Sequence, residues 1–202
     1  MTYKVLNNIT LKNVNNGVIS NIATDLLVIP VNKKLTTSIE FKELDKKTGG
    51  YISKSAKDSL SPGNQSHLLT SLDGVKAKKI LLFKDIDEKN DIYLWLNKYK
   101  SIAKTANSIG CKNISIMDGL NYPKGKDKYW FLEMIARSME SGAYIFSTTK
   151  NKTAKSEKVG KDLVSSQVSL KSVSLITTKL STEEVKKAKT SISIGFSVGE
   201  GV

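Results

Sequence analysis

Carboxylates are the residues of this sequence whose positions come closest to a chemical pattern. Asp85, Asp87 and Glu88 follow an apolar run, and α/β proteins often place a site at the carboxyl end of a buried strand. A carboxylate pair there could serve as general acid and base. We interpret the three residues instead as a solvated loop that also caps the next helix. Glu133 and Glu140 lie two helical turns apart, and we interpret them as helix-surface charges.

The sequence holds one cysteine, Cys111, and one histidine, His67, so it can form no internal disulfide bond. A cysteine nucleophile would need the histidine as its base; the sequence leaves that dyad open, but nothing near either residue supports it. One cysteine and one histidine are too few ligands for a zinc site. Cys111 stands between a predicted helix and a predicted strand, and we interpret it as a small buried hydrophobic residue.

Known catalytic and nucleotide-binding motifs are absent from the sequence. It has no G-x-x-x-x-G-K-[ST] loop, no G-x-G-x-x-G after a strand, no G-x-S-x-G elbow and no H-E-x-x-H motif. We therefore predict no catalytic, cofactor-binding or metal-binding residue in this chain.

The net charge of +13 raises the question of nucleic-acid binding. Of the 32 basic residues only Arg137 is an arginine, and arginine is the residue favoured for specific contacts. We interpret most of the lysines as solvated surface residues. The stretch 147–167 has no apolar period and is typical of a loop. Its lysines are the candidate contact surface for DNA or another polyanion: Lys150, Lys152, Lys155, Lys158 and Lys161.

Predicted strands and helices alternate along most of the chain, and its 39% hydrophobic residues suffice for a buried core. The alternation predicts an α/β fold, with a mixed, largely parallel sheet between two layers of helices. Strands are expected at 3–10, 25–31, 65–72, 78–84, 113–117 and 169–176, and helices at 37–47, 52–57, 91–109, 127–146 and from 181 onward.

Three stretches resemble the amino-terminal domain of the leucyl (cytosol) aminopeptidase family. In 41–51 a helix ends on Gly49-Gly50, 75–83 is a lysine-rich turn leading into an apolar strand, and 133–152 runs from an apolar helix into an aromatic, basic segment. The resemblance implies a macro-like three-layer α/β/α domain over 1–178. It also implies that 179–202 begins a linker helix toward a carboxy-terminal catalytic domain.

The resemblance further implies what the whole protein does. That family removes amino-terminal residues from peptides with two divalent metals, zinc, manganese or magnesium, held in the catalytic domain. This chain carries none of that domain's ligands, so on its own it is expected to be inactive. A role in assembly or regulation is implied, with the catalytic domain and a homo-hexamer as partners. The sequence shows no signal peptide and no membrane-spanning run, so we expect a cytoplasmic protein without a membrane partner.

A nucleotide-binding function is a further alternative. The stretch 24–32 resembles a strand of the macro domains that bind ADP-ribose. In those domains a glycine-rich loop follows and holds the pyrophosphate with its backbone N–H groups. The corresponding stretch 33–39 has no glycine, so this cradle is missing here.

Overall fold

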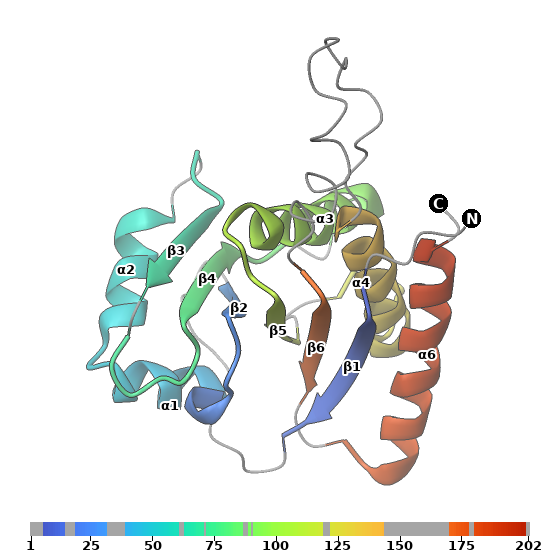
Figure 1. Cartoon of the computed structure of the whole chain (residues 1–202), viewed down its shortest axis with the longest axis horizontal. Helices are drawn as coiled ribbons and strands as arrows, with labels where there is room; N and C mark the ends of the chain where they lie inside the picture. The colour runs from blue at the N-terminus through green and yellow to red at the C-terminus, as the bar shows by residue number, and fades with distance from the viewer. Residues whose placement is uncertain are drawn as a thin grey trace, which may run out of the picture.

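The computed structural model describes residues 6–14, 19–31, 39–60, 63–70, 72–86, 89, 91–118, 122–143, 170–177 and 180–200. A six-stranded sheet forms its centre, in the order β1-β6-β5-β2-β4-β3 (Figure 1). All neighbouring strands are parallel except β3, which runs antiparallel to β4 at one edge. The strands are β1 (Asn8–Asn13), β2 (Leu26–Val31), β3 (Ser66–Thr70), β4 (Lys79–Lys84), β5 (Asn113–Met117) and β6 (Ser172–Thr177).

Helices cover both faces of the sheet, so the predicted three-layer α/β/α fold is confirmed (Figure 1). One layer consists of α3, α4 and α6, and the other of α1 and α2 with a short 3-10 helix, η1. None of the described helices combines the length and the apolar character needed to cross a membrane. The helices are η1 (Ile19–Asn21), α1 (Ile39–Lys47), α2 (Tyr51–Ser59), α3 (Ile92–Ser108), α4 (Lys128–Ala143) and α6 (Thr182–Glu200).

Glycines end α1 where the sequence indicated, and a capping residue begins α3. Gly49 and Gly50 adopt positive φ angles of 63° and 80°, and the Gly50 N–H bonds back to the Asp45 carbonyl at 2.8 Å, which stops α1. At the start of α3, the Asp91 side chain accepts a hydrogen bond from the Tyr93 N–H. The first strand is displaced from its expected position, because β1 pairs with β6 over Asn8–Asn13 rather than over 3–10.

Helix α6 is part of the packed layer. Ala188 and Ile192 are buried in the same core as the inward face of α4. Gly195 and Gly199 bring the two helices into backbone contact, since a Cβ at either position would overlap atoms of α4. The helix expected to lead toward a second domain is therefore fixed on the α/β/α sandwich.

Candidate functional site

Three polar residues lie along the carboxyl edge of the sheet. Asp85 follows β4, Asp118 follows β5, and Thr177 is the last residue of β6. These strands are parallel within one sheet, so their carboxyl ends reach the same edge. Two strand spacings separate Asp85 from Asp118 because β2 lies between β4 and β5, which places their backbones about 10 Å apart.

Asp118 pairs with a lysine and a tyrosine at this edge. Its Oδ2 lies 3.0 Å from the ammonium nitrogen of Lys128, at the start of α4. The Tyr122 hydroxyl donates to both carboxylate oxygens at 3.4 Å. Burial, and then the charge of Asp118, raise the pKa of Tyr122 well above its ordinary value, so this phenol stays protonated and acts as a donor.

An aromatic cluster lies beneath these residues. The ring of Phe131 on α4 lies edge-on to three other rings: Trp95 at 5.5 Å, Tyr99 at 5.7 Å and Tyr122 at 5.1 Å between centroids. Tyr99 also contacts Phe83 of β4 at 5.9 Å. Such edge-to-face contacts fix the ring orientations as well as burying apolar area.

Three buried polar atoms near this edge have no hydrogen-bond partner in the described structure: Trp95 Nε1, the Tyr99 hydroxyl and Thr177 Oγ1. Each such group costs about 1–3 kcal/mol if it stays unpaired. Burial, and then the charges of Asp85 and Asp118, raise the pKa of Tyr99, so its hydroxyl is protonated beside two carboxylates. The edge therefore offers donors and acceptors that ordered water or a polar ligand would satisfy.

Only some of the polar residues at this edge were predicted from the sequence. Asp85 lies at the carboxyl end of β4 as expected, with its Oδ1 accepting from the Ile86 N–H at 2.9 Å, while Asp87 and Glu88 lie outside the described residues. Asp118 and Thr177, which lie along the same edge as Asp85, were not singled out from the sequence. The sequence did carry a signal for them, because each residue follows a predicted strand. Parallel strands in one sheet end at the same edge.

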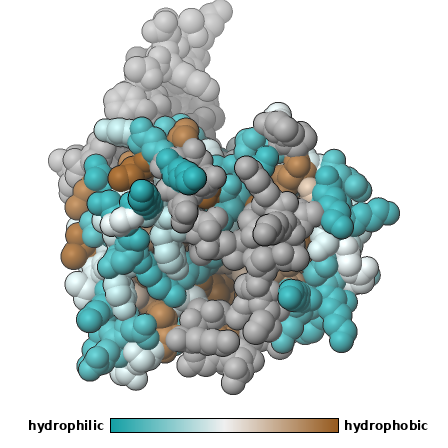
Figure 2. All heavy atoms as spheres, turned by 180° about the vertical axis from the view of Figure 1, so that it is seen from behind, coloured by the Kyte–Doolittle hydropathy of each residue, from teal (hydrophilic) through white to brown (hydrophobic). Residues whose placement is uncertain are grey.

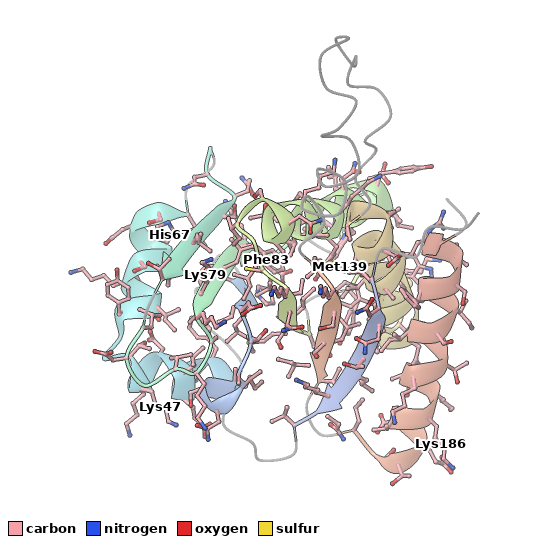
Figure 3. All side chains as sticks on the ribbon, viewed as in Figure 1. Lys47, His67, Lys79, Phe83, Met139 and Lys186 are labelled. Carbon is pink, nitrogen blue, oxygen red and sulfur yellow. The ribbon has the colours of Figure 1, made fainter. Side chains whose placement is uncertain are left out.

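The structure separates the histidine from the cysteine. His67 pairs with Leu82 near the carboxyl end of β4, whereas Cys111 precedes the amino end of β5. Two strands lie between β3 and β5, so the residues are also about 14 Å apart laterally. Figure 3 shows His67 on the edge strand β3. The distance excludes the Cys/His dyad. Cys111 is buried, as expected, and burial raises the pKa of its thiol.

The interpretation of Glu140 as a surface charge is wrong. Its side chain is only 2% exposed, and its Oε2 accepts a hydrogen bond of 3.3 Å from the Leu6 N–H. Leu6, before β1, and Gly199 of α6 lie against Glu140 and cover the face of α4 that carries it. Glu133, two turns earlier, is half-buried.

No metal-binding group is found among the described residues. Nowhere in them do three His, Cys, Asp or Glu side chains gather as metal ligands would, so the side chains present there do not fit the two-metal centre of the aminopeptidases. The candidate polyanion-binding lysines, Lys150 to Lys161, lie outside the described residues.

Comparison of the sequence with known proteins gives a relative. No family model matches the chain. It is 27% identical over 173 residues to a probable cytosol aminopeptidase of Pseudomonas fluorescens (strain SBW25). The match covers 83% of this chain but 32% of that protein, so the chain spans about a third of its relative's length.

Comparison with solved structures supports the fold. A mutant of tomato leucine aminopeptidase aligns with a TM-score of 0.59 and 17% identity, over 91% of this chain and 35% of that one. The macro domain of ganglioside induced differentiation associated protein 2 aligns with a TM-score of 0.62 and 12% identity, over 95% and 86% of the two chains. At these identities the structural matches establish a macro-like fold.

Proposed function

We propose that this chain, which resembles the amino-terminal domain of the leucyl aminopeptidases in sequence and fold, is the non-catalytic accessory domain of a cytoplasmic metal-dependent aminopeptidase. The observation that carries the proposal is the sequence match to a cytosol aminopeptidase over most of this chain and a third of that protein. The macro-like fold of the matched region is consistent with it. The chemistry would belong to a catalytic domain that binds the metals, and this domain would act in assembly or regulation.

Helix α6 supports a role in assembly. Ile194 and Val198 lie one turn apart on it and are 48% and 41% exposed, although α6 is otherwise packed on α4. A large exposed apolar pair on a helix suits contact with another domain or subunit. We propose that the catalytic domain, or a neighbouring subunit of a hexamer, covers this pair.

Two measurements test the accessory role. The native gene beyond the codon for Val202 is expected to encode a two-metal catalytic domain, and that full-length protein is expected to cleave leucine p-nitroanilide in the presence of Mn²⁺ or Zn²⁺. The chain by itself, under the same conditions, is expected to be inactive. A stop codon directly after Val202, or metal-dependent cleavage by the chain alone, would overturn the proposal.

The apolar pair on α6 is tested in the full-length protein. Val198→Lys is expected to lower the assembly state, measured by light scattering after size exclusion, because it places a charge in the contact. Ser197→Lys adds the same charge at an exposed neighbouring position and serves as the control. If both variants assemble like the parent protein, this face of α6 is not a subunit contact.

DNA binding is a second candidate, favoured by the net charge of +13. Hydrophilic side chains spread widely over the described surface in Figure 2. Binding through Lys150 to Lys161 would weaken steeply with salt and show little sequence preference. A short Gly-Ser linker in place of 144–169 would remove the contact. Unchanged affinity in that variant, or an affinity independent of salt, would rule this candidate out.

Nucleotide binding is a third candidate, favoured by the unpartnered donors at the carboxyl edge of the macro-like fold. The lack of glycine in 33–39 counts against it. Calorimetric titration with ADP-ribose tests it directly, because heat of binding that disappears in the Asp118→Ala variant would locate the ligand at this edge. Absence of binding at millimolar ADP-ribose would eliminate it.

A further inference from the structure

A groove lies on the opposite flank of the molecule from β1 and α6, between helix α3 and the antiparallel edge of the sheet. Its volume is about 300 Å³. At roughly 30 Å³ for a water-sized group, this space holds about ten non-hydrogen atoms. Its apolar lining consists of Leu94 of α3, with the buried residues Leu81 and Phe83 of β4 and Ile102 of α3 behind it. Leu94 is 53% exposed, so an apolar surface is open to a ligand.

Lys98 provides the charge of this groove. Its ammonium nitrogen lies 5.6 Å from the centre of the Phe83 ring and donates a hydrogen bond of 3.3 Å to the Gln65 carbonyl oxygen. Among the described residues, no carboxylate lies within ion-pair distance of it. One hydrogen bond to a neutral carbonyl and a ring contact leave donor capacity on an ammonium group, which has three N–H bonds.

The surroundings of Lys98 partly desolvate its ammonium group. Desolvation by the groove lowers its pKa, which the charge of Asp85 partly offsets and that of Lys84 reinforces. A half-buried cation without an ion-pair partner gains from an anion placed beside it. Asn97 and Thr105 lie on the same wall of the groove and can donate further hydrogen bonds, whereas the Ser101 hydroxyl already donates to the Lys98 carbonyl oxygen.

We propose that this groove binds a small organic anion, a carboxylate carried on an apolar ring or chain. The carboxylate lies at Lys98, with the polar groups of α3 beside it, and the apolar body packs against the exposed side chain of Leu94. A neutral apolar ligand would leave the ammonium further desolvated, and an inorganic anion would leave the Leu94 side chain in contact with water. Charge and lining together therefore select an amphiphilic anion.

Phenylacetate and phenylacetamide form a matched pair of probes, since they differ in charge but hardly in shape. Titration of each into the ¹⁵N-labelled chain is expected to shift the amide signals of Leu94, Lys98 and Ser101. The affinity is expected to be at least about fivefold higher for phenylacetate, as for one charge-assisted hydrogen bond at a partly exposed site. Inorganic phosphate is expected to bind more weakly than phenylacetate.

Variants on α3 locate the charge. Lys98→Met should reduce phenylacetate affinity to that of the amide, and Lys98→Arg should retain most of it. Lys104→Met removes the same charge from an exposed position of the same helix and should leave the affinity unchanged. Equal affinity for the two probes would overturn the proposal without any variant. So would equal losses in Lys98→Met and Lys104→Met, phosphate binding as strong as phenylacetate binding, or shifts confined to other elements.

Discussion

The side-chain oxygen of Asn107 accepts a hydrogen bond of 2.8 Å from the backbone N–H of Leu170. The amide group of the same side chain donates to the Ala143 carbonyl oxygen at 3.1 Å. One buried asparagine on α3 thus bonds to the end of α4 and to the residue two positions before β6. These two residues flank 144–169, so a few residues suffice to join them when that segment is excised.

Asn107→Leu is expected to lower the free energy of unfolding by about 2–4 kcal/mol, because two buried backbone groups lose their partners. Asn107→Asp keeps the acceptor for Leu170 but not the donor for Ala143, and should also be destabilised. Urea denaturation measures both changes. Asn97→Leu, at an exposed position of the same helix, is the control and should change stability little. A loss under about 0.5 kcal/mol in Asn107→Leu would contradict the described bonding.

Gly195→Ala tests the close approach of α6 to α4. A Cβ at position 195 would overlap the Glu133 carbonyl oxygen, so the helices must move apart. The free energy of unfolding should fall by about 1–3 kcal/mol or more, as for overpacking in a core. Ser197→Ala adds no clash on the exposed side of α6 and should be neutral or slightly stabilising. Equal thermal midpoints for the two variants would refute the contact.

Asp25, which precedes β2, bonds to residues at the amino ends of β4 and β5. Its Oδ1 pairs with Lys78 at 2.7 Å, and its Oδ2 accepts from the N–H groups of Lys112 at 2.9 Å and Asn113 at 3.1 Å. Burial acts to raise the pKa of Asp25, but the hydrogen bonds and the charge of Lys78 outweigh it and lower the pKa below 3.8. The stabilisation is therefore complete above pH 3.8 and is lost as the pH falls through the lower, folded-state value.

Asp25→Asn should consequently destabilise the protein at pH 7 by about 1 kcal/mol, allowing for solvent screening. The difference from the parent protein should shrink as the pH falls below 3.8. Denaturation at several pH values measures this. Asp58→Asn, an exposed position on α2, is the matched control. A difference that persists unchanged in acid would show that the charge of Asp25 is not its source.

Tyr99→Phe is expected to leave stability unchanged or to raise it by up to about 1 kcal/mol. The buried hydroxyl has no partner in the described structure, while the ring contacts with Phe83 and Phe131 are retained. Tyr99→Leu, which loses the ring, should be destabilised by about 1–3 kcal/mol. A clear loss of stability in Tyr99→Phe would mean that ordered water or a ligand normally satisfies this hydroxyl.

Cys111 should react slowly with a disulfide reagent in the native protein. It is buried, and burial raises the pKa of its thiol, so less thiolate is present at any given pH. We expect the rate at pH 8 to be at least about 100-fold lower than in denaturant, because reaction requires local opening. A native rate close to that of the denatured chain would contradict the burial of this residue.

The elements with strong apolar periods were predictable from the sequence. The strand expected at 113–117 matches β5 at both ends, and the helix expected at 91–109 contains α3 with one residue to spare on each side. Both have their apolar residues spaced as the sheet and core require. The short helix η1 was missed, since three residues are too few to carry a period.

The candidate site was less predictable because it depends on contacts between distant parts of the chain. The placement of Asp85 and Asp118 on strands two positions apart requires the strand order, which no local pattern encodes. The burial of Glu140 requires α6 to pack on α4. The hydrogen bonds of Asn107 were not predictable from local sequence either. Its two partners lie 36 and 63 residues away, and an asparagine near a helix end is usually solvated.

Glycines set the spacing within the layer formed by α3, α4 and α6. A Cβ at Gly142 would lie 2.6 Å from the Lys100 carbonyl oxygen of α3, and one at Gly199 would lie 2.8 Å from Glu140 Cβ of α4. Main-chain atoms of α3 at Gly142, and the first side-chain carbon of Glu140 at Gly199, thus set the distances between these helices. The layer should open as one cooperative unit, so that the protected amides of its three helices exchange their hydrogens with a common free energy.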